Sequence, residues 1–391
     1  MVIIIVGSCV KKEDMGKFPN ISVAGNKMLL GFAEGFALND CTVECVSITA
    51  RSMRRLKKNG EPLVQCKENY SSNGVNFNVI KYVNTILLKQ LTISRSIYKE
   101  LKRLVKKYSS EEIVLCVFNT ISYIARPTLR ISKKYKISTC GIIADLPIKC
   151  KKNFLQKIED KLEIETVKSF DYLVPLSKYT AIDFGNNTPY CVVEAGLAEF
   201  FAPIESENND VVYTGSLNCL SGMQLLIECA EKFVGTSVKF HVYGAGEYEG
   251  ALIEAVAKGY PIIYHGRVSN LDAINAQRKA KILICPRLPD DFTTRYTFPS
   301  KVLEYMSCGV PVITNDLAGI PDDYYDYINV IKDDVNSWFK CINDIFENYQ
   351  NYSDKAKMGL AYIKAEKNWK QQTKKVLSFF IENRNNDNSD K

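Results

Sequence analysis

The residues best suited to chemistry lie between positions 295 and 313, where Arg-Tyr-Thr-Phe-Pro-Ser-Lys-Val-Leu-Glu leads into Tyr-Met-Ser-Cys-Gly and an apolar Val-Pro-Val-Ile run. Pro299 suits the first turn of a helix, and Ser300 and Lys301 add a donor and a positive charge beside the exposed N–H groups there. Glu304 follows Lys301 by about one turn, since ~3.6 residues make a turn. The segment therefore predicts a site for a nucleotide diphosphate, whose phosphates need donors and whose ribose hydroxyls need an acceptor.

Glycine turns follow three strand-like runs in the same half of the chain. Gly215 and Ser216 follow the run 211–214, and their backbone N–H groups are suited to meeting a phosphate. Gly244 and Gly246 form a second turn, but Glu249 stands where a dinucleotide fingerprint needs its third glycine, which argues against a nicotinamide or flavin site. The third turn, His-Gly-Arg-Val, offers Arg267 and Val268 as an edge that a nucleobase could approach.

Polar residues in the first half lie where strand-like runs end or helices begin. Asn119 and Asp145 each follow an apolar run, and Gly25, Asn26 and Lys27 begin a helix after a long loop. Polar groups at strand ends meet ligands in open α/β sheets. The alternative is that Asn119 and Asp145 are helix caps or turn residues, and that the long loop is plain surface.

Neither the two histidines nor the thirteen cysteines form a recognisable site. His241 and His265 do not support a catalytic triad and are more typical of structural groups, and no residues have metal-ligand spacing. The cysteines include no CxxC pair and lie mostly in apolar runs, which is typical of buried free thiols in a reducing cytosol.

Length and charge limit the protein class. The 391 residues predict two domains, and a net charge of +7 is a mild excess that favours acidic small molecules or an anionic membrane surface over nucleic acid. No apolar run approaches the ~20 residues that cross a bilayer, and the first apolar run reads as a buried strand rather than a signal peptide. Two basic stretches, 51–58 and 95–107, remain; the second has helical apolar spacing and is interpreted either as an interfacial helix or as the solvated face of a domain helix.

Short β-branched runs alternate with amphipathic stretches along the whole chain. Those of the first half are Val2–Val6, Val43–Ile48, Ile113–Phe118, Ser138–Ile143 and Tyr172–Pro175. A polar break at 196–210 predicts a linker, after which the rhythm restarts. The pattern predicts two doubly wound α/β domains with parallel sheets, whose ligand crevices face each other across a cleft.

Taken together, these motifs resemble the GT-B glycosyltransferases, specifically the large retaining family numbered four, over nearly the whole chain. The resemblance is strongest from 211 to 313, and Ile-Ser-Val-Ala-Gly-Asn-Lys (21–27) and Pro-Leu-Ser-Lys (175–178) look like counterparts in the acceptor domain. It implies an acceptor-binding domain at 1–198, a donor-binding domain at 199–362 and a helix at 363–382 that crosses back to the first domain. The tail at 383–391 is too polar to be expected to order.

The resemblance also implies roles for individual residues, and it shows where this sequence departs from the pattern of the family. The family has two glutamates separated by seven residues; Glu304 is the second, expected on the ribose, and Tyr296 replaces the first. Ser216 and Ser221 replace two cations that neutralise the diphosphate in the family. We therefore expect the catalytic set Lys301, Glu304, Arg295 and Asn119; the donor-binding set Gly215, Ser216, Gly244, Gly246, Arg267, Val268, Arg287, Tyr296, Phe298, Pro299 and Ser300; and the acceptor-binding set Gly25, Asn26, Lys27 and Asp145.

The implied activity is transfer of a sugar from a nucleotide-diphosphate sugar to a saccharide or lipid-linked saccharide, with retention, in surface polysaccharide or glycoconjugate synthesis. Neither a metal nor a cofactor besides the donor is expected. The location expected is the cytoplasm, with peripheral contact to anionic lipid at the inner membrane face. The alternatives are a non-catalytic scaffold or regulatory subunit that kept the fold, and a nucleotide-sugar epimerase.

Overall fold

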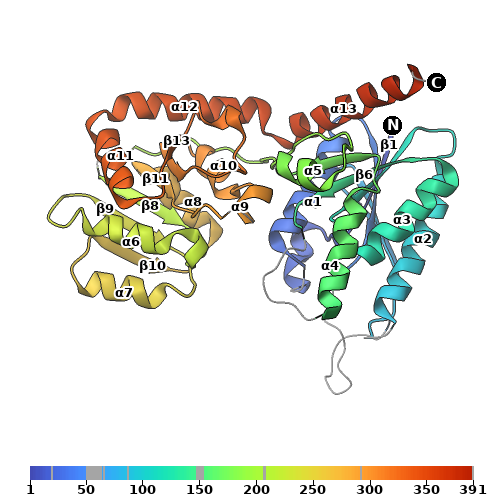
Figure 1. Ribbon diagram of the computed structural model, residues 1–391, viewed down its shortest axis with the longest axis horizontal. Helices are drawn as coiled ribbons and strands as arrows, with labels where there is room; N and C mark the ends of the chain where they lie inside the picture. The colour runs from blue at the N-terminus through green and yellow to red at the C-terminus, as the bar shows by residue number, and fades with distance from the viewer. Residues whose placement is uncertain are drawn as a thin grey trace. The chain divides into compact units, whose positions relative to one another are not determined.

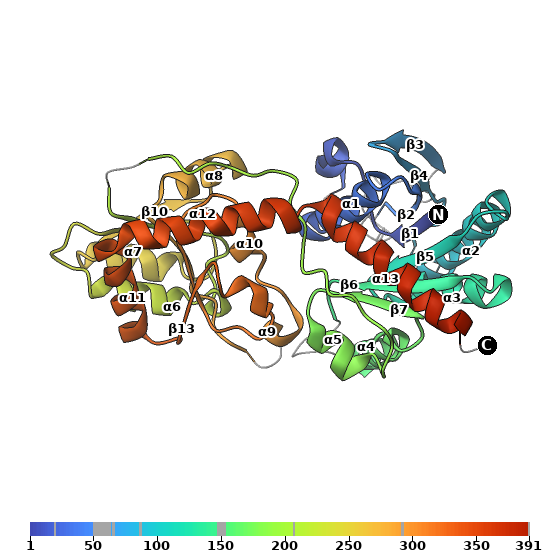
Figure 2. The ribbon, with the colours of Figure 1, turned by 90° about the horizontal axis from the view of Figure 1, so that it is seen from above.

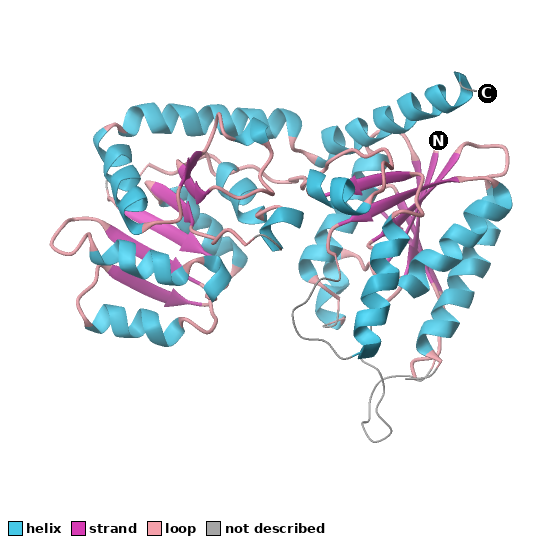
Figure 3. Cartoon of the chain, in the orientation of Figure 1, coloured by secondary structure: helices cyan, strands magenta, loops and turns pink. Residues whose placement is uncertain are grey.

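A computed structural model of the chain describes residues 1–18, 21–49, 64, 67–85, 88–146, 154–205, 208–290 and 293–389. The chain divides into two units: Met1–Gly196 together with Trp369–Lys391, and Leu197–Asn368. In each unit helices enclose a sheet (Figure 3). The prediction of two α/β domains built on parallel sheets is confirmed.

The sheet of the first unit (Figure 1) has seven strands in the order β3-β4-β2-β1-β5-β6-β7, which can be followed by the labels in Figure 2. Its strands are β1 (Val2–Gly7), β2 (Thr42–Ser47), β3 (Glu68–Ser72), β4 (Val75–Val79), β5 (Ile113–Phe118), β6 (Ser138–Ile143) and β7 (Tyr172–Pro175). All neighbours are parallel except β3 and β4, which form an antiparallel hairpin. The sequence did not predict this hairpin, because β3 is a polar edge strand and asparagines interrupt the apolar residues of β4.

The first unit has apolar cores on both faces of its sheet. Ile3 and Ile5 face one core, and Val2, Ile4 and Val6 face the other, as the two-residue period of a strand requires. Burial on both faces explains why these strands read as continuous apolar runs. The helices of this unit are η1 (Lys12–Lys17), α1 (Val23–Ala37), α2 (Lys89–Lys107), α3 (Ser122–Tyr135), α4 (Phe154–Val167), α5 (Lys178–Phe184) and α13 (Trp369–Ser389).

The last helix, α13, returns to the first unit and packs along α1 (Figure 2). Its Trp369 ring lies 5.1 Å from the Phe32 ring and is so close to Gly31 that a Cβ there would lie 2.0 Å from the indole. The helix continues to Ser389, so the prediction of a disordered tail from residue 383 is wrong over the described residues. Arg384 gives the physical reason, since it pairs with Glu112 and donates to the Ile113 carbonyl oxygen.

Helix α2 carries the second basic stretch and is part of the first core. Ile97, Leu101 and Leu104 are fully buried between α2, α3 and the sheet, so they cannot enter a membrane. The interpretation of α2 as an interfacial helix is therefore wrong, and the solvated face of a domain helix is the correct one. The first basic stretch, 51–58, lies outside the described residues.

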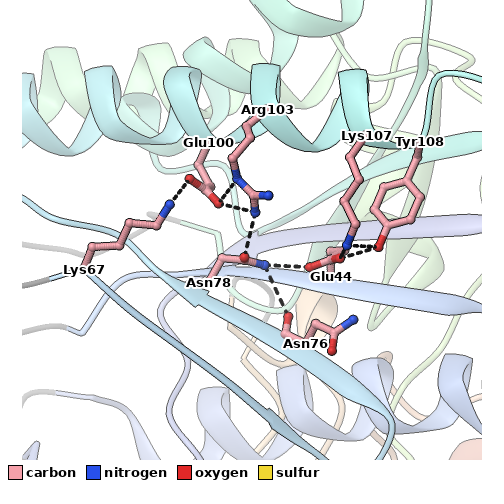
Figure 4. Close-up of polar contacts among 8 residues, drawn as sticks. All are labelled: Glu44, Lys67, Asn76, Asn78, Glu100, Arg103, Lys107 and Tyr108. Carbon is pink, nitrogen blue, oxygen red and sulfur yellow. Dashed lines mark hydrogen bonds and ion pairs between the residues drawn. The ribbon is translucent and has the colours of Figure 1, made fainter.

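The basic side of α2 is tied to the sheet by an ionic cluster (Figure 4). Glu44, which is 2% exposed on β2, accepts hydrogen bonds from Asn78 (2.7 Å), Lys107 (2.9 Å) and Tyr108 (2.5 Å). Burial alone would raise the pKa of Glu44, but these three donors lower it below its usual value. Glu100 likewise pairs with two cations, Lys67 and Arg103.

The second unit has a six-stranded sheet in the order β10-β9-β8-β11-β12-β13, parallel throughout. The strands are β8 (Asp210–Thr214), β9 (Lys239–Tyr243), β10 (Ile262–Gly266), β11 (Ile282–Cys285), β12 (Val312–Asn315) and β13 (Asn329–Ile331). The helices are η2 (Cys219–Ser221), α6 (Met223–Glu231), α7 (Glu249–Ala257), α8 (Asn270–Lys279), α9 (Thr293–Tyr296), α10 (Ser300–Met306), η3 (Asp322–Tyr324), α11 (Val335–Glu347) and α12 (Tyr349–Glu366).

The border between the units differs from the predicted limits. Helix α12 runs unbroken past residue 362 and belongs wholly to the second unit, and Leu197 donates to the Lys367 carbonyl oxygen where the two connecting segments pair. The described part of the predicted linker lies against the second unit, since Phe201 and Ile204 bond to the Ser307 and Arg278 carbonyls.

Among the described residues, no helix is both long and apolar enough to cross a bilayer. The cysteines that the structure describes are all free thiols, and most are buried.

Candidate functional site

Two adjoining cavities open at the carboxyl edge of the second sheet, one of 330 Å³ and one of 390 Å³. Gly215, Ser216 and Lys301 line both. Ligands of open parallel sheets bind at this edge, and each volume lies within the ~300–1,000 Å³ typical of ligand pockets. The predicted site residues that line one or both cavities are Gly215, Ser216, Gly244, Arg267, Val268, Arg287, Pro299, Ser300 and Lys301.

A tight loop after β8 forms the floor that the two cavities share. The Gly215 N–H donates to the Tyr243 carbonyl and the Leu217 N–H to the Ala245 carbonyl, while the Ser216 N–H between them has no partner within the described part of the chain. Gly244 must be glycine, because a Cβ there would lie 1.8 Å from the Gly215 carbonyl oxygen and its φ is +148°. The loop thus presents one unpaired donor on a closely packed backbone.

Three cations line the cavities. Arg287 lines the first, Arg267 the second, and Lys301 both, whereas no acidic residue of the described ranges lines either one. In the described part of the chain neither arginine makes an ion pair or a side-chain hydrogen bond. This charge distribution suits an anionic ligand.

Helix α10 begins at the cavities and brings Lys301 to Glu304. Its first residue is Ser300, and Pro299 is the N-cap with non-helical backbone angles, one position earlier than the sequence predicted. The Lys301 ammonium lies 2.8 Å from Glu304 Oε1 and 3.4 Å from Thr214 Oγ1. An ammonium has three N–H donors, so one remains for a ligand.

Glu304 is about one-third exposed but is not itself part of either cavity wall. It lies behind Lys301 and beside Thr214, and its Oε1 also accepts a 2.6 Å hydrogen bond from Gln277 Nε2. Its Oε2 has no partner among the described residues. The carboxylate therefore has one oxygen fixed by the protein and one available as an acceptor.

Four other predicted donor-side residues are not brought to the cavity walls. Arg295 and Tyr296 end the short helix α9, where both are half-buried and engaged in contacts. Phe298 is 5% exposed and packs 5.3 Å from the Tyr324 ring, so its side chain belongs to the core. Gly246 lies one residue beyond the second cavity and packs on the Leu217 backbone.

The turn before α7 is closed to a dinucleotide phosphate. Glu249 Oε1 accepts a 2.9 Å hydrogen bond from the Gly246 N–H, so a carboxylate occupies the place a phosphate would take at this helix start. The absence of a nicotinamide or flavin site stays a prediction from the sequence.

The two histidines stack beside the second cavity. His241 Nδ1 lies 3.0 Å from His265 Nε2, and the Tyr243 ring lies parallel to the His265 ring at 4.1 Å. Burial and the neighbouring His241 lower the pKa of His265, and burial raises the pKa of Tyr243. Of these three residues only Tyr243 lines a cavity, and the His265 ring stacks on the Tyr243 ring.

The predicted residues of the first unit divide into structural and exposed groups. Asn119 has φ +61°, and its Oδ1 accepts from the Ala144 and Asp145 N–H groups, so it links two strand ends as a turn residue. Asn26 is 3% exposed and exchanges two hydrogen bonds with the Val10 backbone, which uses its amide for the loop after β1. Lys27 and Asp145 are exposed.

The side chain of Asn26 thus serves the loop after β1, and its part in acceptor binding stays a prediction. Asn119 has the hydrogen bonds of a turn residue, which is the alternative that the sequence left open. Gly25 donates its N–H to Ser22 Oγ, which caps α1. A helix start and a strand end are patterns that serve folding as often as binding, and the sequence alone does not distinguish the two.

The sequence did not indicate three residues that hydrogen-bond to one another or to the pair Lys301 and Glu304: Thr214, Gln277 and Tyr305. Tyr305 is fully buried, and its hydroxyl binds both the N–H and the carbonyl of Thr214. Burial raises the pKa of Tyr305 well above its usual value, so it acts as a neutral hydrogen-bonding group. Gln277 stands out only because it is a polar residue buried in the protein interior, and the structure is needed to show that burial.

Most of the second unit matches a known protein family. Residues 208–348 match the family model described as Glycosyl transferases group 1. A search of curated proteins finds no match.

Solved structures share the fold over nearly the whole chain. Sucrose-phosphate synthase from Thermosynechococcus elongatus is similar with a TM-score of 0.64 at 12% identity, covering 98% of both chains. The lipopolysaccharide outer core galactosyltransferase WaaB gives 0.63 at 14%, and Anabaena HepE in complex with UDP gives 0.62 at 11%, each covering 98% of this chain and 100% of the other. These structures are GT-B glycosyltransferases, so the likeness shows that the fold is GT-B, as the sequence predicted.

Proposed function

From the premise that residues 208–348 are a glycosyl transferases group 1 domain in a chain of GT-B fold, we propose that this protein transfers a sugar from a nucleotide-diphosphate sugar to a saccharide or lipid-linked saccharide. The observation that carries the proposal is the convergence of Lys301, Arg287 and Arg267 on two adjoining cavities without an acidic wall residue in the described ranges. Such a site favours a diphosphate over a neutral sugar.

In the proposed complex the diphosphate lies at the wall that both cavities share. Lys301 offers its third N–H, Arg287 offers an unpaired guanidinium, and the Ser216 N–H offers a backbone donor. The Ser300 and Lys301 N–H groups at the start of α10 add donors, since they have no partner within the helix. Arg287 would thereby provide charge that Ser216 and Ser221 cannot.

The nucleoside is proposed to occupy the second cavity. Its base would approach the backbone at Arg267 and Val268, and its ribose hydroxyls would donate to Glu304 Oε2. The neighbour HepE was solved with UDP and with UDP-glucose, which makes a uridine diphosphate sugar the first donor to test. Tyr296, which replaces the family's first glutamate and lies outside the two cavity walls, is proposed to give neutral hydrogen bonds to a donor sugar that extends beyond them.

The proposed reaction breaks the bond between the anomeric carbon and the phosphate oxygen and forms a bond from that carbon to an acceptor hydroxyl oxygen. Negative charge grows on the leaving diphosphate, and Lys301 and Arg287 would stabilise it without a metal ion. The acceptor proton passes to the leaving phosphate on the same face, which gives retention and needs no separate base. Retention follows from the family resemblance.

The acceptor is proposed to meet the first unit near the exposed Lys27 and Asp145. A role in surface polysaccharide or glycoconjugate synthesis in the cytoplasm remains our proposal. Insertion of α2 into a membrane is no part of it, because the apolar side of that helix is buried.

A non-catalytic scaffold is the second candidate, because Tyr296 stands where the family has a glutamate. Donor turnover separates the two: a scaffold binds nucleoside diphosphates but transfers and hydrolyses nothing over a broad acceptor panel. An epimerase would instead change the donor sugar with no acceptor present.

The direct test combines a donor screen with two variants. Thermal shift against uridine, guanosine, adenosine and cytidine diphosphate sugars identifies the donor, since a bound ligand raises the melting temperature. We expect Lys301→Ala and Glu304→Ala each to reduce transfer by roughly 100-fold while the circular dichroism spectrum stays unchanged. Full activity in both variants would refute the site assignment.

A further inference from the structure

A glutamine buried beneath the site holds the carboxylate proposed to bind ribose. Gln277 lies near the end of α8 and is fully buried. Its Nε2 lies 2.6 Å from Glu304 Oε1 and 2.8 Å from Thr214 Oγ1, and its Oε1 lies 3.5 Å from Cys308 Sγ. Each polar atom of the amide therefore has a partner within the second unit.

The two N–H groups of Gln277 meet the same two oxygens as the Lys301 ammonium. Lys301 approaches Glu304 Oε1 and Thr214 Oγ1 from the cavity side, at 2.8 and 3.4 Å, whereas Gln277 approaches from the buried side. If Lys301 turns toward a diphosphate, Glu304 keeps one hydrogen bond and does not become an unsatisfied charge. A charge-assisted bond of this length is among the stronger kinds in proteins.

We infer that Gln277 is a positioning residue that fixes Glu304 Oε1 and so presents Oε2 to the ribose hydroxyls of the donor. The inference rests on the proposed function, because it takes Glu304 as the ribose acceptor. A carboxylate held by one oxygen has a fixed plane, and its second oxygen then meets a hydroxyl without first losing rotational freedom. Gln277 acts through Glu304 and needs no contact with the donor.

A purely structural role makes a different prediction. If Gln277 only fills space in the core, its replacement lowers the stability of the fold and weakens the binding of every nucleotide by the same factor. If Gln277 positions Glu304, its replacement weakens the binding of a ribonucleotide more than that of the matching deoxynucleotide. Only the ribonucleotide has the hydroxyl that donates a hydrogen bond to Glu304.

The experiment measures binding of UDP, 2′-deoxy-UDP and 3′-deoxy-UDP to the full chain by isothermal titration. The wild-type protein is expected to bind at least one deoxy form about tenfold more weakly than UDP. Gln277→Met keeps length and packing but removes both donors, and it is expected to reduce this ratio to less than threefold. Cys308→Ala removes the thiol that contacts the amide oxygen and, at 3.8 Å, the Glu304 backbone carbonyl, but leaves both Gln277 N–H donors in place. It is the matched control and is expected to keep the wild-type ratio.

Two more variants complete the design. Gln277→Met combined with Glu304→Ala is expected to bind UDP no more weakly than Glu304→Ala alone, since both changes act through one carboxylate. Gln277→Glu removes both N–H donors and places a second carboxylate beside Glu304, so it is also expected to reduce the difference in binding between UDP and the deoxy forms. This variant also tests the inference should Gln277→Met fail to fold.

An unchanged ratio in Gln277→Met, or equal weakening of all three nucleotides, would overturn the inference and leave the proposed function standing. Failure of the wild-type protein to bind UDP, ADP, GDP or CDP would instead overturn the proposed function, and the inference with it.

Discussion

Arg287 gives the most direct test of how the site neutralises the charge of a bound diphosphate. It lines the first cavity together with Lys301 and makes no ion pair or side-chain hydrogen bond within the described part of the chain. Replacing it by methionine keeps most of the apolar stem and removes one positive charge. Because no group among the described residues loses a partner, we expect affinity for a diphosphate to fall while stability stays constant.

The size of the effect follows from the half-buried position of Arg287. Two unit charges ~4 Å apart interact by about 1 kcal/mol in water and about 4 kcal/mol at an effective dielectric constant of about 20. A hydrogen bond to a charged group contributes about 1.5–3 kcal/mol. A loss of about 2 kcal/mol lies within both ranges and corresponds to a roughly 30-fold increase in Kd, since each 1.4 kcal/mol is tenfold.

Isothermal titration with UDP at two ionic strengths measures this loss. The wild-type affinity should decrease more with salt than that of Arg287→Met, because the variant has one fewer charge to screen. Arg126→Met, an exposed change of the same kind on α3, is the matched control. A Kd for Arg287→Met within threefold of the wild-type value would show that other groups neutralise the diphosphate, and would refute the argument from the missing cations.

Three other predictions concern stability and metal use. The pKa of Glu44 is lowered in the folded protein, so its contribution to the free energy of unfolding is full above the unfolded pKa of about 4.3 and is lost as the pH falls through the lower folded value. Urea denaturation should therefore show that Glu44→Gln is destabilised most near pH 7 and approaches the wild-type stability at low pH. The exposed Glu366→Gln serves as control. A difference in unfolding free energy between Glu44→Gln and wild type that is the same at every pH would contradict the argument. Trp369→Ala should destabilise the first unit by about 3–5 kcal/mol because α13 loses its anchor on α1, and an unchanged melting profile by circular dichroism would contradict that packing role. Transfer activity should persist in excess EDTA, and activity restored only by a divalent cation would refute metal-independent transfer.

The strands of both sheets were largely predictable, because strands buried on two faces are continuous apolar runs. Ile113–Phe118 and Ser138–Ile143 have the same limits in the sequence prediction and in the structure. The hairpin of β3 and β4 was not predictable, since a polar edge strand carries no such pattern. The tail beyond residue 383 was predicted to be disordered because composition does not reveal the pairing of Arg384 with Glu112.

The candidate site was predictable where it depends on local spacing. Ser300, Lys301 and Glu304 belong to one helix, and the turn at Gly215 follows directly from a strand, so their relation can be read along the chain. Phe298 and Asn26 lie in the same motifs but serve the core, because side-chain direction depends on what packs against each element.

Local sequence patterns account for the two α/β domains, for the turns that are proposed to bind an anion and for the spacing of Lys301 to Glu304, because these follow from periods of two and 3.6 residues and from local backbone chemistry. The tertiary structure decided which charges meet. Arg287 reaches the turn at Gly215 because β11 lies beside β8, and Gln277 reaches Glu304 because α8 packs against the end of β8. Residues so far apart in sequence come together only through the order of the strands, which no local pattern specifies.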